Sequence, residues 1–146
     1  MDGGGAVRRV VLLCGPPGAG KTTAARASGL EVFDRDDAAW TTESQFQAAL
    51  DDLGRRRHAD AVVIRAGATS SARRRWAELV RATHVMLVLE PAEVSAARVR
   101  ARGRDDMVRT LAGINRWWTA FDHDDAAPRF VSWSVLDGPD DLGLMT

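Results

Sequence analysis

One stretch of the sequence, residues 10–23, limits most strongly what this chain can fold into. It reads VVLLCGPPGAGKTT, an apolar run followed by a glycine-rich turn and then by helix-forming residues. Gly15, four further residues and then Gly20, Lys21 and Thr22 fit the pattern G-x-x-x-x-G-K-[ST]. The glycines of this pattern let backbone N–H groups turn toward a phosphate, and the positive end of the following helix points at the same place. The stretch therefore predicts a strand, a phosphate-binding loop and a helix.

The same loop predicts a site for ATP and Mg²⁺. We expect Lys21 to reach the β and γ phosphates and the Thr22 hydroxyl to ligand Mg²⁺. Lys21 is the only lysine in a chain with 19 arginines, so the one compact and flexible cation stands at the loop. The residues expected to contact the nucleotide are Gly15, Pro16, Pro17, Gly18, Ala19, Gly20, Lys21, Thr22 and Thr23.

Length and composition favour one domain, spanning residues 1–146, without a strong overall electric field. The formal net charge is zero, so any attraction to nucleic acid or to a membrane would have to come from local patches. A lone cysteine, Cys14, excludes an internal disulfide, and no apolar run approaches the roughly 20 residues of a membrane span. We therefore expect a protein of the cytoplasm, where ATP is available, with no membrane partner.

Apolar strands alternate with amphipathic helices along the chain. The segments expected to form strands are 8–14, 30–34, 60–65, 84–89 and 130–135, and helices are expected to begin near Lys21, Thr42, Ser70, Pro91 and Met107. On the last helix the apolar stripe passes through Ile114 and Trp118, which leaves Trp117 off it. This order predicts an α/β three-layer sandwich, with a five-stranded parallel sheet, helices on both faces and a ligand at the carboxyl ends of the strands.

Acidic residues follow the second expected strand. Asp34 and Asp36 are two positions apart in the loop that should lie beside the phosphate-binding loop. A carboxylate there can order Mg²⁺ or accept the proton of an acceptor hydroxyl, and its position matters more than its basicity. The alternative is that these side chains only cap the loop before the next helix.

These residues resemble those of P-loop kinases of the nucleoside, shikimate and polynucleotide kinase superfamily. Residues 15–22 match the phosphate loop, and Arg35-Asp36-Asp37 resembles the Arg-Asp-Asp of 5′-hydroxyl polynucleotide kinases, whose first Asp activates the acceptor hydroxyl. Small-molecule kinases with Asp-x-Asp at this place use the first Asp for Mg²⁺ and the second for the substrate. Both resemblances imply that Asp36 binds the acceptor, and the second implies that Asp34 helps Thr22 to hold the metal.

Two departures from these kinases concern the substrate. Ala38 and Ala39 stand where polynucleotide kinases carry an arginine for a substrate phosphate, which counts against a polynucleotide substrate. Arg65 ends the third expected strand, where many of these enzymes have an Asp that supports Mg²⁺. We expect Arg65 to grip a substrate phosphate or the transferred group, unless it only pairs with Asp34 or Asp36.

The resemblance also implies a short lid at about residues 98–106. Arg98 and Arg102 are four positions apart and share a helix face, so both would close over the γ-phosphate, with Gly103 as the hinge. The alternative is that these arginines are solvated surface charges. Trp40, just after the acidic loop, is the candidate for stacking on an acceptor base.

Two arginine clusters, 55–57 and 73–75, would form a basic rim for a phosphorylated substrate, unless they only reflect the arginine-rich composition. The second cluster lies in the first turn of an expected helix, where the macrodipole disfavours cations, and this predicts an anion nearby.

The sequence thus predicts an enzyme that moves the γ-phosphate of ATP to a hydroxyl of a nucleic acid, a nucleoside or a small molecule. The alternative is a P-loop ATP-binding or ATPase module that acts through a partner without phosphotransfer. The only lysine lies in the phosphate loop and cannot form the Asn-Lys-x-Asp motif that reads guanine, which counts against a GTPase switch. By resemblance, small size and many arginines suggest a phage or actinobacterial source, and host cytoplasm in the phage case.

Overall fold

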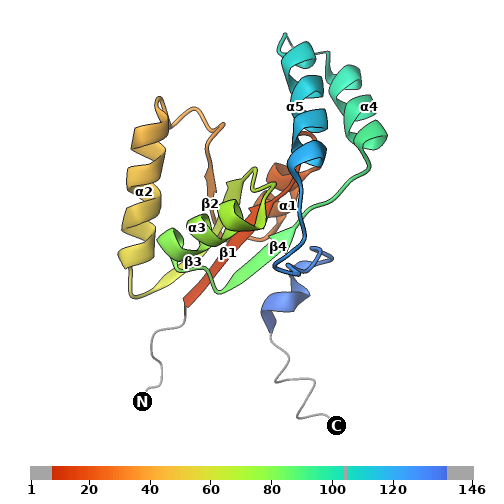
Figure 1. Ribbon diagram of the computed structural model, residues 1–146. Helices are drawn as coiled ribbons and strands as arrows, with labels where there is room; N and C mark the ends of the chain where they lie inside the picture. Colours follow the sequence, from red (N-terminus) through yellow and green to blue (C-terminus); the bar gives the residue numbers. More distant parts are fainter. Residues whose placement is uncertain (1–7, 104, 138–146) are drawn as a thin grey trace.

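The computed structural model describes residues 8–103 and 105–137. Its centre is a parallel sheet of four strands: β1 (Arg8–Cys14), β2 (Glu31–Asp34), β3 (Ala59–Arg65) and β4 (His84–Leu87). The strand order is β2-β3-β1-β4, and every pairing is parallel (Figure 1).

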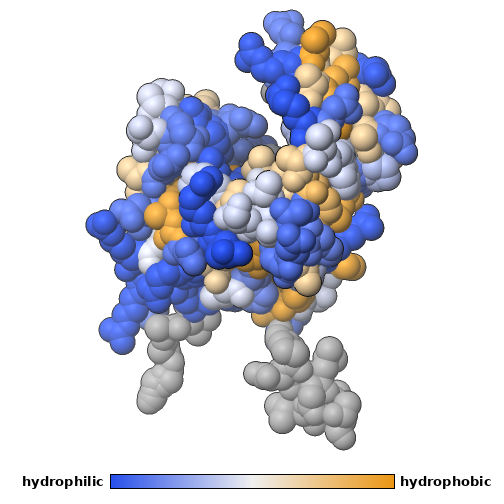
Figure 2. All heavy atoms as spheres, in the orientation of Figure 1, coloured by the Kyte–Doolittle hydropathy of each residue, from blue (hydrophilic) through white to orange (hydrophobic). Residues whose placement is uncertain are grey.

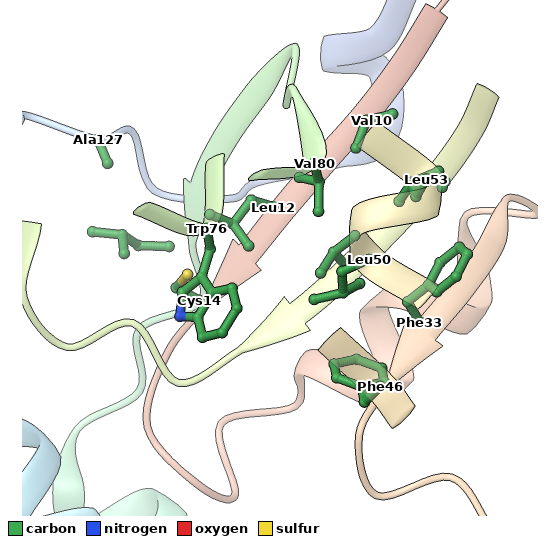
Figure 3. Close-up of a cluster of buried hydrophobic side chains, with 13 residues drawn as sticks. Val10, Leu12, Cys14, Phe33, Phe46, Leu50, Leu53, Trp76, Val80 and Ala127 are labelled. Carbon is green, nitrogen blue, oxygen red and sulfur yellow. The ribbon is translucent and has the colours of Figure 1, made fainter. Parts of the chain in front are cut away.

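Helices cover both faces of this sheet, as predicted. Alternate residues of β1 point to opposite faces, because successive strand residues do so. Val10, Leu12 and Cys14 pack with residues of α2 (Glu43–Arg55) and α3 (Ser70–Val80), as Figure 3 shows. Val11 and Leu13 pack on the other face, against α1 (Lys21–Ala27) and the segment near residue 133. The α/β three-layer architecture is therefore confirmed.

The prediction of a fifth strand at 130–135 is wrong. Next to β4 the chain makes a single parallel bridge between Leu87 and Arg129, and it then turns into a 3₁₀ helix, η1 (Trp133–Asp137). The indole Nε1 of Trp133 donates to the Ala24 carbonyl on α1 at 2.8 Å, and the Trp133 ring packs on Phe130. These contacts bend the segment toward α1, so it cannot run on beside β4.

A variant of the capping box stands at the start of α2, where a helix was predicted to begin near Thr42. Thr42 Oγ1 accepts from the Gln45 backbone N–H at 3.0 Å, while Gln45 Oε1 accepts from the Thr41 N–H at 2.7 Å. The helix continues past Gly54 to Arg55. A Cβ at Gly54 would lie 2.0 Å from the Leu79 carbonyl oxygen, so this glycine allows α2 and α3 to pack closely.

The remaining helices, α4 (Ala92–Arg102) and α5 (Met107–Ala120), form a hairpin that rises above the carboxyl ends of the strands (Figure 1). Figure 2 shows apolar residues gathered along this hairpin and a hollow between it and the rest of the molecule. Gly103 ends α4 with φ of 59°, at the predicted hinge. Residue 104, inside the predicted lid, lies outside the described residues. Among the described residues, no helix is long and apolar enough to cross a membrane.

The prediction of which tryptophan of α5 faces inward is wrong. Trp117 is buried and Trp118 is only partly buried. The difference arises because the Trp117 indole N–H donates to the Ala66 carbonyl at 2.7 Å, an inward polar contact that an apolar stripe does not reveal.

Candidate active site

The glycine-rich loop between β1 and α1 is shaped by contacts that exclude side chains. A Cβ at Gly15 would lie 2.2 Å from the Val88 carbonyl oxygen, and Gly20 has φ of 98°, a left-handed conformation that favours glycine. Gly20 is also the N-cap of α1, and no side chain caps the helix there. The first intrahelical bond runs from Ala24 N–H to the Gly20 carbonyl. The N–H groups of the first turn of α1 are therefore available to a phosphate.

Lys21 folds back over this loop. Its Nζ donates to the carbonyl oxygen of Gly15 and, at 3.2 Å, to that of Pro16. Burial lowers the pKa of Lys21 to about 8, while the charges of Asp34 and Asp36 act in the opposite direction. A poorly hydrated ammonium group of this kind gains from the arrival of an anion, which favours its charged form.

Thr22 and Asp34 meet beside the loop, as the resemblance implied. The Thr22 hydroxyl donates to Asp34 Oδ2 at 2.7 Å, and Asp34 Oδ1 accepts from the Asp36 backbone N–H at 3.0 Å. Asp34 is buried at the end of β2, and its bond from the Asp36 N–H fixes the turn that carries Asp36.

The donor set at Thr22 and Asp34 fits Mg²⁺, which prefers oxygen ligands and keeps several waters besides one or two carboxylates and the substrate phosphates. Within residues 8–103 and 105–137, no three His, Cys, Asp or Glu side chains gather into a metal cluster. A metal held by one hydroxyl, one carboxylate and a nucleotide needs no such cluster.

A cleft of about 620 Å³ joins these groups to side chains from other elements. It lies at the carboxyl ends of the strands, where the topology predicted the ligand. Its walls are residues 17–23, 34–36 and 64–66 together with Glu43, Arg102, Asp106 and Thr110.

Arg65 lines this cleft at the end of β3. Its guanidinium lies 4.0 Å from the centre of the Trp76 ring, and Nη2 donates to Glu43 Oε2 at 2.9 Å. Arg35 approaches the other oxygen of Glu43 at 3.4 Å. Among the described residues, the ion-pair partner of Arg65 is Glu43. The alternative that Arg65 pairs with Asp34 or Asp36 is therefore wrong.

Glu43 is the residue of the site that sequence reasoning missed. It opens α2, and hydrogen bonds from Gln47 and Arg65 hold the pKa of its carboxyl below the usual value. Its position directly after the capping residue Thr42, at the end of the acidic loop, was the available signal. Helix starts carry acidic residues so commonly that this signal is weak.

The two hairpin arginines face the phosphate loop, as expected from their spacing. Arg98 Nη1 lies 3.4 Å from the Ala19 carbonyl oxygen and Nη2 lies 3.5 Å from Glu90. Arg102, one turn further along α4, lines the cleft itself. Both positions suit cations that approach a nucleotide bound at the loop.

Three arginines of the predicted basic rim, Arg55, Arg56 and Arg73, have acidic partners. Arg73 is almost fully buried, and two of its nitrogens donate to Asp125 at 2.9 and 2.8 Å. This carboxylate is the anion that the macrodipole conflict predicted. In the other cluster, Arg55 pairs with Asp51, and Arg56 pairs with Glu31 and Asp52.

Trp40 does not line the cleft. Its ring packs edge to face on Phe46 at 5.3 Å and lies against the core beneath α2. The structure therefore gives its predicted base-stacking role no geometric support.

The solved structures that this chain resembles include two kinases. A shikimate kinase from Acinetobacter baumannii in complex with shikimate aligns at a TM-score of 0.51 and 19% identity, over 96% of this chain and 94% of that one. An unliganded sugar kinase from Janibacter sp. HTCC2649 aligns at a TM-score of 0.54 and 17% identity, over 93% and 90%. The chain has the P-loop kinase fold. No protein-family model matches the sequence, and no curated protein matches it significantly.

Proposed function

We propose that this protein is an ATP-dependent kinase that transfers the γ-phosphate of ATP to a hydroxyl of a small molecule. One observation carries the proposal: the phosphate loop with Lys21, the Thr22–Asp34 pair and Asp36 all border a single cleft. A nucleotide site and an acceptor site in one cleft are what direct phosphoryl transfer requires, because its catalysis is mostly positioning and charge stabilisation.

The proposed roles divide the cleft into two halves. In the phosphate half, residues 15–23 bind the nucleotide phosphates and Lys21 neutralises their charge, with Arg98 and Arg102 approaching from the hairpin. Thr22 and Asp34 would hold Mg²⁺, which would supply positive charge to neutralise the charge that develops on the transferred phosphate. In the acceptor half, formed by Asp36, Glu43 and Arg65, the Asp36 carboxylate orients the acceptor hydroxyl and accepts its proton.

Several features favour a small acceptor over a nucleic acid. The cleft measures about 620 Å³, and part of that volume belongs to the phosphate half. Three of the six arginines in the clusters that would bind a polynucleotide backbone pair with Asp125, Asp51 and Glu31, and Trp40 lies outside the cleft. Both relatives in fold are named as kinases of small molecules, shikimate and a sugar.

The position of Arg65 indicates that the proposed acceptor carries an anionic group. A guanidinium held against Trp76 beside a cleft presents donors suited to a carboxylate or a phosphate. We assign Arg65 the role of binding an anionic group on the acceptor in exchange for its bond to Glu43.

The second candidate is a module that binds ATP without transferring phosphate. It is favoured by one observation, that β3 ends in Arg65 where an Asp would support the metal. Such a protein would bind ATP and show no more turnover than its Lys21→Ala variant.

Transfer of labelled γ-phosphate from ATP separates these candidates. The acceptors are hydroxylated acids, sugars, nucleosides, nucleoside monophosphates and 5′-hydroxyl oligonucleotides, each with Lys21→Ala and Asp36→Asn as controls. We expect label on a small hydroxylated acceptor, lost in both variants. Label on oligonucleotides alone would contradict the small acceptor, and ATP binding without any labelled acceptor would favour the binding module.

A further inference from the structure

A single backbone carbonyl, that of Ala66, joins the phosphate loop to the hairpin. It accepts from the Gly15 N–H, the first glycine of the loop, at 3.1 Å. The same oxygen accepts from the Trp117 indole N–H of α5 at 2.7 Å. Ala66 itself lines the cleft, so the shared acceptor lies between the loop and the hairpin at the proposed site.

Both helices of the hairpin also rest directly on the loop. A Cβ at Gly18 would lie 3.1 Å from Val99 Cγ2 of α4, and a Cβ at Gly113 of α5 would lie 3.4 Å from Pro17 Cγ. The hairpin is therefore packed against the loop through residues in the body of both its helices.

Trp117 is held firmly in this position. It is 4% exposed, and its ring stacks on Phe121 with centres 4.9 Å apart and planes inclined by 16°. The Arg73 guanidinium faces Phe121 at 5.6 Å and is fixed in turn by Asp125. A buried indole with its donor directed at one carbonyl transmits small displacements because close-packed side chains have little freedom to adjust.

We infer that Trp117 is a positioning residue that couples the phosphate loop to the α4–α5 hairpin through the Ala66 carbonyl. The hydrogen bond stabilises the loop in the form that receives phosphates, so its loss weakens nucleotide binding. Coupling is reciprocal, so a nucleotide at the loop also changes the environment of Trp117. This inference rests on the proposed function only in requiring that a nucleotide binds at the loop.

Trp118 provides a matched control for this residue. It lies on the same helix and contacts the same Phe121 ring at 5.6 Å, but its buried indole nitrogen has no hydrogen-bond partner among the described residues. Replacing either tryptophan by phenylalanine keeps an aromatic ring, and only Trp117→Phe removes a hydrogen bond.

The first test compares ADP·Mg²⁺ binding to wild type, Trp117→Phe and Trp118→Phe by calorimetry, with a thermal melt of each protein without nucleotide. We expect roughly 3- to 10-fold weaker binding in Trp117→Phe than in Trp118→Phe, the usual range for one net hydrogen bond. Equal affinities in the two variants, at comparable melting temperatures, would overturn the inference. Failure of the wild type to bind nucleotide would instead contradict the proposed function.

A second test needs no folded Trp117 variant. In the ¹⁵N-labelled wild type, the assigned indole N–H signal of Trp117 should shift on addition of ADP·Mg²⁺, and by more than that of Trp118. A Trp117 signal that stays in place while the phosphate-loop signals move would show that the two are not coupled.

Discussion

The phosphate half of the cleft is centred on a run of consecutive residues, whereas the acceptor half is assembled from three separate elements. Residues 15–23 present backbone N–H groups and one cation, Lys21, in a loop whose shape is enforced by glycines. Asp36 follows β2, Glu43 begins α2 and Arg65 ends β3. In this half, charged side chains take the place that backbone N–H groups have in the phosphate half.

This difference determines what each half can tolerate. The positions of backbone donors are set by the conformation of the loop, so the phosphate half depends mainly on a few glycines, on Lys21 and on the residues that hold the loop in place. The ion pair between Glu43 and Arg65 can exchange partners with an arriving ligand, so the acceptor half can be changed without loss of nucleotide binding. Substitutions in the two halves should therefore have separable effects.

The largest effect is expected at Lys21. Lys21→Ala should lower phosphotransfer on the order of 10²- to 10³-fold, because it removes the charge aimed at the transferred group. Lys21→Arg should fail as well, since a planar guanidinium cannot take the place of a compact ammonium folded over the loop. Steady-state kinetics measures both, and wild-type rates in Lys21→Arg would show that any cation suffices.

Asp36→Asn should lower the transfer rate by about 10²-fold while ATP affinity stays unchanged. The matched control is Asp37→Asn, because Asp37 is exposed and its side chain only accepts from the Ala39 N–H within the loop. Single-turnover kinetics and ATP titrations distinguish the two steps. An equal loss of activity in both variants would mean that the loop, rather than the Asp36 carboxylate, is what matters.

Arg65→Gln should raise the KM for the acceptor by about 10-fold, which is in the range expected for the loss of a hydrogen bond to a charged group. The KM for ATP should change little. Arg75 is the matched control, since its guanidinium lies 5.3 Å from the same Trp76 ring but it does not line the cleft. Arg75→Gln should leave both constants unchanged. A raised KM for ATP in Arg65→Gln would place this residue in the phosphate half.

The smallest effect concerns the pKa of Lys21 in the protein without nucleotide. With ¹³C-labelled lysine the chain gives one ε-carbon signal, which should titrate near pH 8 instead of 10.5. Between these values the unfolded chain binds more protons than the folded one, so the free energy of unfolding should rise with pH in this window. Lys21→Ala should lack that rise, and a midpoint near 10.5 would contradict the burial of Lys21.

The phosphate half could be read from sequence because its residues are adjacent in the chain and each glycine has a local reason. The sheet and both helical layers followed from apolar periodicity. The fifth strand failed because the Trp133 indole finds the Ala24 carbonyl on α1, a contact between distant residues that composition does not reveal.

The side-chain contacts in and around the cleft were only partly predictable for the same reason. The meeting of Asp34 with Thr22 was expected from the resemblance, but the pairing of Arg65 with Glu43 depends on how α2 packs beside β3. Arg73 looked like a surface cation until the fold placed it against Asp125, and Trp117 was misassigned because its partner is a backbone carbonyl.

A crystal structure with ADP, Mg²⁺ and a phosphorylatable acceptor tests the central claim most directly, that one cleft holds both reactants. The account predicts the β-phosphate on the first-turn N–H groups of α1 beside Lys21, Mg²⁺ on Thr22, and the acceptor hydroxyl within hydrogen-bond distance of Asp36. A nucleotide bound elsewhere, or an acceptor hydroxyl that Asp36 does not contact, would contradict it.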